Sequence, residues 1–294
     1  MYKPGMFYKE NEEEIIMRLG VRGHDVVHHN LEELVKKTNE KNLKSIHLAL
    51  KKVKTGFEIT DGSMTPGMAK YFKSIFNKFN IDVSILGCYI NLANPDDDEL
   101  NELLKKFKEH IRFARDLGCS IVGTETGALN REYVYTPENN SEEAFQRTLN
   151  SIKVIVEEAE KFGVIVAIEG VSKHVINTPE RMKRVLDNIN SNNLQVIFDP
   201  VNLINEKNYQ DQDDLIKRSF ELFGERIVAI HVKDFVYEDG EIKLASIGKG
   251  SLNYKLLLSL IKERKPYIDI IMENTTEEDL DESIKYITEI YNNL

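Results

Sequence analysis

Short runs rich in valine and isoleucine recur along the chain, and longer segments with helical periodicity separate them. Each run has the length of a buried strand and is apolar on both faces, which suits parallel strands covered by helices. The eight runs are Ile15 to Val21, Ser45 to Leu50, Asp82 to Ile90, Ser120 to Thr126, Val164 to Glu169, Leu194 to Asp199, Ile227 to Lys233 and Ile268 to Glu273. The chain therefore reads as strand and helix in regular alternation.

This alternation within 294 residues favours a closed (β/α)8 TIM barrel, an α/β fold with a parallel eight-stranded barrel that typically needs about 250 residues. An open doubly wound sheet is the alternative. Against it, Gly20 and Gly23 do not complete a G-x-G-x-x-G fingerprint after the first strand, and no G-x-x-x-x-G-K-[ST] loop occurs. The sequence shows no linker or shift in composition, so we expect residues 1–294 to form a single barrel domain.

Local signals mark some of the helix ends. Thr178 stands before Pro179, which suits a capping hydroxyl ahead of a proline in the first helical turn. Thr275 and Glu278 have the spacing of a capping box. The last helix is therefore expected from about Thr276 to the C-terminus.

Charge and composition limit the partners. The net charge of −10 disfavours nucleic acid and anionic membranes as partners, and no apolar run approaches the roughly 18 residues of a membrane span. The N-terminal segment breaks at Pro4 and Gly5 before a signal-peptide core. Cys88 and Cys119 lie in apolar stretches and do not suggest a disulfide scaffold. We expect a cytoplasmic protein that binds neither nucleic acid nor membrane.

Polar residues end four consecutive predicted strands. They are Glu169, Asp199, His231 and Glu273. The active site of such a barrel lies at the carboxyl ends of its strands, so these four side chains can converge at one mouth.

Clustered carboxylates repel one another and are costly to bury, so a cation is expected among them. Three carboxylates and one imidazole suit Mn²⁺, Co²⁺ or Mg²⁺ and can accept Zn²⁺. The alternative is that each acid caps a helix or pairs with a lysine.

The sequence around these residues resembles the xylose isomerase-like TIM barrel superfamily, and within it the sugar phosphate isomerase/epimerase group. That group also includes ketose 3-epimerases, inosose dehydratases and an apurinic endonuclease branch. The resemblance extends from about Gly20 to the C-terminus. The motifs that carry it are Ile-Glu169-Gly, Phe-Asp199-Pro-Val-Asn202-Leu, Ile-His231-Val-Lys233-Asp234, Ile247-Gly248-Lys249-Gly250 and Met-Glu273-Asn.

The resemblance implies one divalent metal ion held by Glu169, Asp199, His231 and Glu273, with Glu169 and Glu273 also acting as the catalytic acid/base pair. It further implies a sugar or sugar phosphate as the small-molecule substrate. A metal polarises the carbonyl of an open-chain sugar, so that one carboxylate can remove a proton and another can return it. Return to the opposite face gives epimerisation, and transfer between neighbouring carbons gives isomerisation.

Five further residues are candidates for substrate binding. Lys233 shares the side-chain parity of His231 and can point to the barrel mouth, or it can pair with a nearby acid. Lys249, between two glycines, lies on a loop that can approach a ligand, or it is a mobile solvated lysine.

Asn202 can bind a sugar hydroxyl, although capping is the commoner role, and the group's ketose 3-epimerases carry histidine there. Glu125 and Tyr89 can reach the sugar, and buried pairing or core packing is the alternative for each. His47 is expected to be a core histidine. Cys88 is expected to pack in the core rather than act as a nucleophile.

Three other functions remain open. An inosose dehydratase-like lyase begins with the same proton abstraction and then loses hydroxide. An apurinic endonuclease-like zinc nuclease needs more histidine ligands, and Asn202 stands where one of them is expected. A barrel that binds sugar without catalysis is the third. The sequence does not specify the substrate, the native metal or the oligomeric state, a homo-oligomer included.

Overall fold

The computed structural model describes residues 17–60 and 62–294 and shows a closed barrel of parallel strands. Around the barrel the strands follow the order β1-β10-β7-β6-β5-β4-β3-β2. Their bounds are β1 Arg18–Arg22, β2 Ser45–Leu48, β3 Asp82–Gly87, β4 Ile121–Glu125, β5 Ile165–Glu169, β6 Leu194–Phe198, β7 Ile227–Val232 and β10 Asp269–Met272. The predicted (β/α)8 barrel is confirmed. Seven of its strands lie within the predicted runs, and β1 extends one residue beyond the first run, to Arg22.

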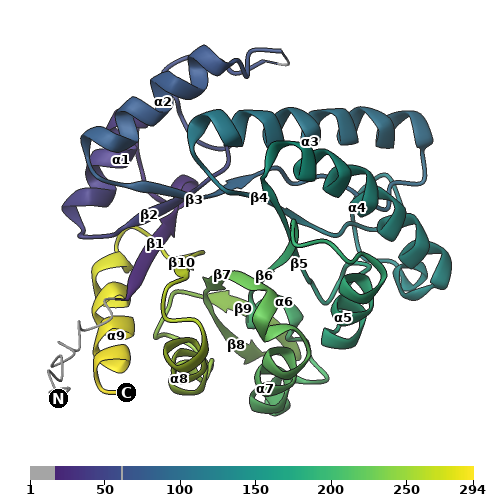
Figure 1. Ribbon diagram of the computed structural model, residues 1–294. Helices are drawn as coiled ribbons and strands as arrows, with labels where there is room; N and C mark the ends of the chain where they lie inside the picture. Colours follow the sequence, from purple (N-terminus) through teal and green to yellow (C-terminus); the bar gives the residue numbers. More distant parts are fainter. Residues whose placement is uncertain (1–16, 61) are drawn as a thin grey trace, which may run out of the picture.

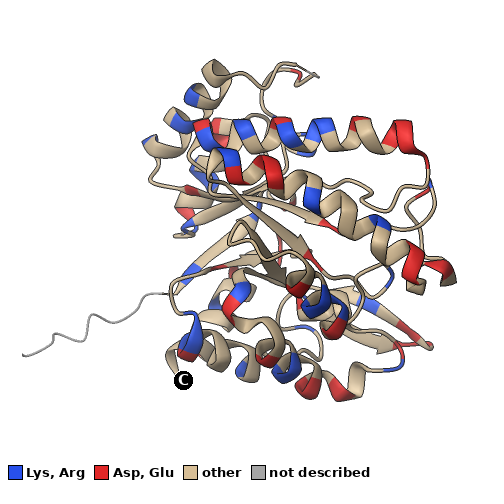
Figure 2. Cartoon of the chain, turned by 45° about the vertical axis from the view of Figure 1, so that its right-hand side comes forward, with Lys and Arg blue, Asp and Glu red and all other residues tan. Residues whose placement is uncertain are grey.

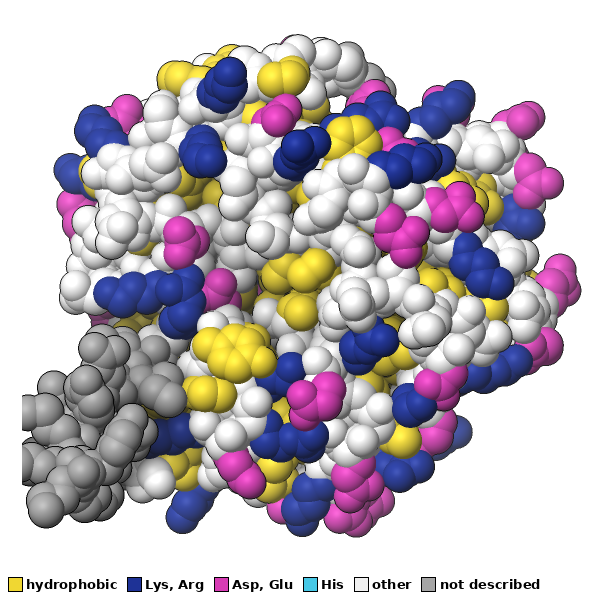
Figure 3. Space-filling view, in the orientation of Figure 1, with side chains coloured by type: hydrophobic (Ala, Val, Ile, Leu, Met, Phe, Trp, Pro, Cys, Tyr) yellow, Lys and Arg dark blue, Asp and Glu magenta, His cyan; other side chains and the backbone are white. Residues whose placement is uncertain are grey.

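Helices surround the barrel (Figure 1). They are α1 Leu31–Glu40, α2 Pro66–Lys78, α3 Asp97–Leu117, α4 Glu142–Phe162, α5 Pro179–Asn188, α6 Pro200–Leu203, α7 Gln212–Phe223, α8 Tyr254–Arg264 and α9 Leu280–Asn292. Basic and acidic residues are interspersed along the outer helices (Figure 2) and on the face shown in Figure 3. The main apolar core fills the space between strands and helices. No helix in the described part of the chain is long and apolar enough to cross a bilayer.

The predicted start of α5 is confirmed, and the predicted start of α9 is wrong. The Thr178 hydroxyl accepts a hydrogen bond from the backbone N–H of Arg181, and Pro179 opens the helix. In contrast, α9 begins at Leu280, so Thr275 and Glu278 form no capping box. Thr276 instead accepts a hydrogen bond from the backbone N–H of Asp279, a local turn that delays the helix.

A two-stranded antiparallel hairpin follows β7 and is absent from the sequence-based expectations. It consists of β8 (Asp234–Glu238) and β9 (Glu241–Ala245). Asp239 and Gly240 form its turn and both have positive φ, as a type I′ turn requires. The Asp-Gly pair between alternating apolar residues is a known hairpin signal.

Two predicted features lie outside the described residues. These are the Pro4-Gly5 break and the beginning of the first apolar run at Ile15. Residues 18–21 of that run lie in β1.

Candidate active site

The four predicted ligand residues come together at the carboxyl ends of neighbouring strands. Glu169 ends β5, Asp199 follows β6 and caps α6, His231 lies in β7, and Glu273 follows β10. All four are buried, with exposed fractions of 1%, 1%, 0% and 4% in that order. A cluster of buried ionisable side chains at one end of a barrel is typical of a functional site.

His231 lies between the two glutamates. Its Nδ1 atom is 3.2 Å from Oε1 of Glu169 and 3.3 Å from Oε1 of Glu273. Asn202 donates a hydrogen bond to Oε1 of Glu169 at 2.7 Å. Asp199 accepts backbone hydrogen bonds from residues 201 and 202 through Oδ1, which fixes its carboxylate at the start of α6.

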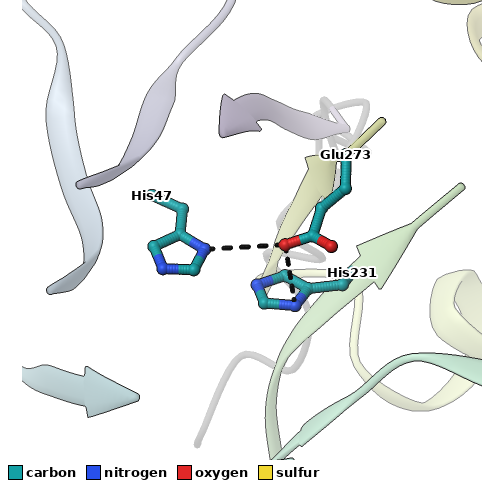
Figure 4. A group of neighbouring side chains, drawn as sticks. All are labelled: His47, His231 and Glu273. Carbon is teal, nitrogen blue, oxygen red and sulfur yellow. Dashed lines mark ion pairs between the residues drawn. The ribbon is translucent and has the colours of Figure 1, made fainter. Parts of the chain in front are cut away.

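Two overlapping groups of side chains have the spacing of metal ligands. Potential ligand atoms of Glu169, Asp199 and His231 lie within 4.8 Å of one another, and so do those of His47, His231 and Glu273. Figure 4 shows His47 and His231 both directed at the Glu273 carboxylate. The other three predicted residues therefore lie around His231, and His47 of β2 lies next to them.

Two basic side chains also contact these carboxylates. The Lys233 ammonium is 2.9 Å from Oδ2 of Asp199 and 3.4 Å from Oε2 of Glu273. Arg22 of β1 is 3.2 Å from the same Glu273 oxygen. Lys233 is only 4% exposed. Pairing with lysine, the alternative to metal binding, is thus present for Asp199 and Glu273, while Glu169 has Asn202 and His231 as its partners.

The electrostatics follow from this mixture of charges. Burial lowers the pKa of His231, but the charges of Glu273 and Glu169 outweigh it and raise that pKa to about 9. Burial opposes ionisation of Glu273, yet His231 and Lys233 hold its pKa well below the usual range. Burial raises the pKa of Asp199 in spite of Lys233. Glu273 is therefore ionised at neutral pH, and a metal ion would displace a proton from His231.

A cleft of about 190 Å³ opens onto this cluster. The side chains that line it are Arg22, His24, Lys52, Tyr89, Glu125, Tyr133, Glu169, Lys233 and Glu273. Larger clefts lie elsewhere on the barrel, but they are lined by none of the four predicted ligands. The chemistry therefore indicates the smaller cleft as the candidate active site.

Among the predicted substrate-binding residues, Tyr89, Glu125 and Lys233 line the cleft. Asn202 contacts Glu169 beside it. Lys249 does not line the cleft and instead forms an ion pair with Asp279 on the outer surface, where it is half exposed. The structure thus brings four of these five side chains to the site and leaves Lys249 outside it.

Several site residues were not singled out for function from the sequence. Arg22 contacts Glu273, and Tyr133 donates a hydrogen bond to Glu125 at 3.2 Å. His47, expected to be a core histidine, is fully buried but stacks on His231 with ring centroids 5.0 Å apart. Its Nδ1 atom has no hydrogen-bond partner among the described residues.

The two cysteines lie away from this chemistry. Cys88 and Cys119 are free and buried, and burial raises the pKa of each thiol to about 12. Neither is a thiolate nucleophile at neutral pH. Core packing of Cys88 agrees with the expectation from the sequence.

The fold and the site define a class of protein: a closed βα barrel that gathers buried carboxylates and imidazoles at the carboxyl ends of its strands. The profile of the xylose isomerase-like TIM barrel family matches residues 49–290. The chain belongs to this xylose isomerase-like TIM barrel family.

Three of the solved structures with the same fold are similar to this chain over almost its whole length. The 3-keto-D-glucoside 4-epimerase from E. coli is 13% identical with a TM-score of 0.73, and the match covers 93% of this chain and 100% of that one. The IOLI protein with a binding zinc atom is 18% identical, with a TM-score of 0.74 and coverage of 94% and 99%. A probable 3-DHS dehydratase from Bacillus anthracis is 13% identical, with a TM-score of 0.70 and coverage of 92% and 99%.

At these identities the similarity shows the shared fold alone. A comparison with curated protein sequences finds no match.

Proposed function

We propose that the protein is a divalent-metal-dependent isomerase or epimerase of a sugar or sugar phosphate. The observation that carries this proposal is the position of Glu169 and Glu273. Both line the same cleft, and both lie within 3.3 Å of one imidazole, His231. Two carboxylates facing one small cleft are what a proton abstraction and return require.

The residues fit a divalent cation. Glu169, Asp199, His231 and Glu273 would hold it, and Nε2 of His231 is buried without a hydrogen-bond partner among the described residues. Carboxylate oxygens with imidazole nitrogen suit Mn²⁺, Co²⁺ or Mg²⁺ and accept Zn²⁺. When bound, such an ion polarises a substrate carbonyl and acidifies the neighbouring C–H group.

The chain's own side chains prepare the two glutamates for proton transfer. Arg22 and Lys233 hold Glu273 ionised, as a proton acceptor must be. Asn202 fixes the Glu169 carboxylate from the other side through Oε1. Proton removal by one glutamate and return by the other, to the opposite face, inverts a stereocentre. Return of the proton to the adjacent carbon interconverts an aldose and a ketose.

A dehydratase acting on a cyclic polyol ketone, as in inosose dehydration, is the second candidate. It is supported by the fold shared with a probable 3-DHS dehydratase. Both candidates need the same first proton abstraction, and only the fate of the product separates them. A zinc nuclease is less favoured, because Asn202, where a ligand histidine is expected, instead supports Glu169.

The free cysteines agree with the cytoplasmic location that we propose.

The test is metal analysis of the purified protein, followed by a screen for exchange of substrate hydrogen with solvent deuterium. The panel contains ketoses, ketose phosphates and inosose, each with Mn²⁺, Co²⁺, Mg²⁺ or Zn²⁺. We expect exchange that stops in excess chelator and returns with metal. Exchange with a change of configuration supports epimerisation, and loss of water supports the lyase. Full activity in chelator, or metal-loaded protein that exchanges none of the panel, would contradict the proposal.

A further inference from the structure

We infer that the substrate carries an oxyanion group, a carboxylate or a phosphate, and that Lys52 and His24 bind it on one side of the cleft. The inference rests on the proposed function, since it names the class of substrate for the same cleft.

Two opposite sides of the cleft differ in the charge of their lining residues. Arg22 and His24 lie at the end of β1 and just after it, in the short helix Gly23–Asp25, and Lys52 follows β2. Glu125 ends β4 and Glu169 ends β5. In the closed barrel β1 and β2 are neighbours, and β5 lies on the opposite side from β1 (Figure 1). Basic residues at β1 and β2 therefore face acidic residues at β4 and β5 across the mouth. Glu273 and Lys233, which follow β10 and β7, lie between the two sides and are paired with each other.

Three lysine and arginine side chains line the cleft, and two of them already have carboxylate partners. Arg22 forms two hydrogen bonds of 2.9 Å with Asp25 and a third contact with Glu273. Lys233 is paired with Asp199 and Glu273. These cations balance the chain's own acids, so neither is a sufficient reason to expect an anionic ligand.

Lys52 is different. Its ammonium lies 5.2 Å from the centre of the Tyr89 ring, and it forms no ion pair with any residue in 17–60 or 62–294. Tyr89 in turn contacts His47 through its hydroxyl at 3.2 Å, so the ring is held in place beneath the lysine. A cation at the rim of a cleft that has no ion-pair partner within these ranges, and only a longer-range interaction with Glu125, is suited to a ligand oxyanion.

His24 adds a hydrogen-bonding group beside Lys52. Its Nδ1 atom is buried and has no hydrogen-bond partner within the described part of the chain. Burial, together with the charges of Arg22 and Lys52, lowers the pKa of His24 to about 4. The neutral imidazole can donate one N–H to an oxyanion, in a region where the surrounding charge is positive.

The opposite side of the cleft suits hydroxyl groups. Glu125 accepts a hydrogen bond from Tyr133, and both side chains line the cleft next to Glu169. A polyol chain with one anionic end therefore matches the cleft, with its hydroxyls toward β4 and β5 and its anionic end toward β1 and β2.

The test compares binding of four probes by calorimetry: inorganic phosphate, D-fructose, D-fructose 6-phosphate and D-fructuronate. The last three share a carbon skeleton and differ at the terminal group, so they separate a phosphate from a carboxylate and both from a neutral end. Each is measured on the full chain, with and without Mn²⁺, for wild type, Lys52→Met and Lys54→Met. Lys54 is an exposed lysine of the same segment that does not line the cleft, so its variant is the matched control.

We expect at least one anionic probe to bind wild type and Lys54→Met alike, and to bind Lys52→Met about tenfold or more weakly, the loss expected for one charge-assisted contact. Absence of anion binding to wild type, or equal binding to Lys52→Met, would overturn the inference. If the protein binds metal and exchanges deuterium on neutral ketoses but shows no preference for anions, the inference is wrong and the proposed function stands. If the protein binds anions through Lys52 but takes up no metal, the inference stands and the proposed function is wrong.

Discussion

Two successive layers of side chains inside the barrel differ sharply in chemistry. The lower layer contains Ile85, Ala167, Ile197, Ala229 and Ile271, which form a buried apolar cluster of their own. The upper layer lies two residues further along the strands. On β5, β6, β7 and β10 it lies above the apolar cluster, and on β1, β2 and β4 it lies above Gly20, Ser45 and Gly123. From β1, β2, β4, β5, β6, β7 and β10 it contains Arg22, His47, Glu125, Glu169, Asp199, His231 and Glu273.

Successive inward side chains of a strand are two residues apart, so Ala167, Ile197, Ala229 and Ile271 each lie below one of the four predicted ligands. The lower layer excludes water and is packed by shape alone. The upper layer is held by charge: Arg22 and His231 face four carboxylates, whereas His47 is neutral because burial and the charge of His231 lower its pKa. The residues that stabilise the barrel and the residues of the candidate active site are therefore only two positions apart along the same strand.

Gly87 shows how closely the upper layer is packed. A Cβ atom at this position would lie 2.5 Å from Nε2 of His47 and 3.0 Å from the Tyr89 ring. Glycine therefore leaves the space in which His47 and Tyr89 meet.

The largest expected effect is on catalysis. Replacing Glu273 by Gln in the upper layer removes the ionised group that accepts the proton, and it also removes a metal ligand. Deuterium exchange should fall by about 10²–10⁴-fold, the usual contribution of a positioned acid or base. Metal affinity should fall with it. The control is Glu278→Gln, an exposed acid shortly after the site. Unchanged exchange in Glu273→Gln would reject the acid/base role.

The corresponding change in the lower layer should affect stability and leave the metal site intact. Ile197→Ala creates a cavity two residues below Asp199, where Ile197 is 1% exposed. The free energy of unfolding should fall by about 2–5 kcal/mol, as for other buried truncations. Denaturant titration measures the loss, and elemental analysis checks the metal. A stable Ile197→Ala variant that has lost metal would erase the distinction between the layers.

His110, a buried histidine of the outer helix α3, can be compared with His231 through the pH dependence of stability. Burial lowers the pKa of His110 in α3 to about 4, whereas the glutamates raise that of His231. The unfolded chain takes up a proton at His110 near pH 6.5 and the folded chain only near pH 4. Stability from this group is therefore complete above pH 6.5 and is lost as the pH falls towards 4, by up to about 3 kcal/mol.

The His110→Phe variant isolates this contribution. Its stability should change less than that of wild type when chemical denaturation is repeated between pH 7 and pH 4.5. Parallel pH dependences for the two proteins would show that His110 titrates normally in the fold.

The smallest effect is expected at Lys249. Because its only described partner is Asp279 on the surface, Lys249→Met should change the exchange rate by less than about twofold. A large rise in the substrate KM would instead show that this loop closes over the substrate, as its glycines permit.

The barrel could be predicted because its signals are local and repeated. Apolar runs and helical segments alternate through the chain, and Glu169, Asp199, His231 and Glu273 each end such a run. Arg22 and His47 follow the same two-residue period in β1 and β2, so the pattern could have identified them. The hairpin of β8 and β9 also had its signal, in Asp239-Gly240.

The remaining details depend on contacts between distant segments. Nothing near Lys233 in the sequence shows that its ammonium reaches Asp199 and Glu273 rather than Asp234. The Asp234 carboxylate instead accepts backbone hydrogen bonds from Gly248, Gly250 and residue 252, which anchors the loop after the hairpin. Likewise, the predicted barrel already places β5 beside β6, but no local signal shows that the Asn202 side chain donates a hydrogen bond to Glu169.

The central claim is that Glu169, Asp199, His231 and Glu273 hold one cation. Crystals grown with Mn²⁺ and measured for anomalous scattering test it most directly. We predict one strong peak bonded to these four side chains, with Lys233 displaced from at least one of its two carboxylates. A cleft without a peak, in which Lys233 still bridges Asp199 and Glu273, would contradict the claim.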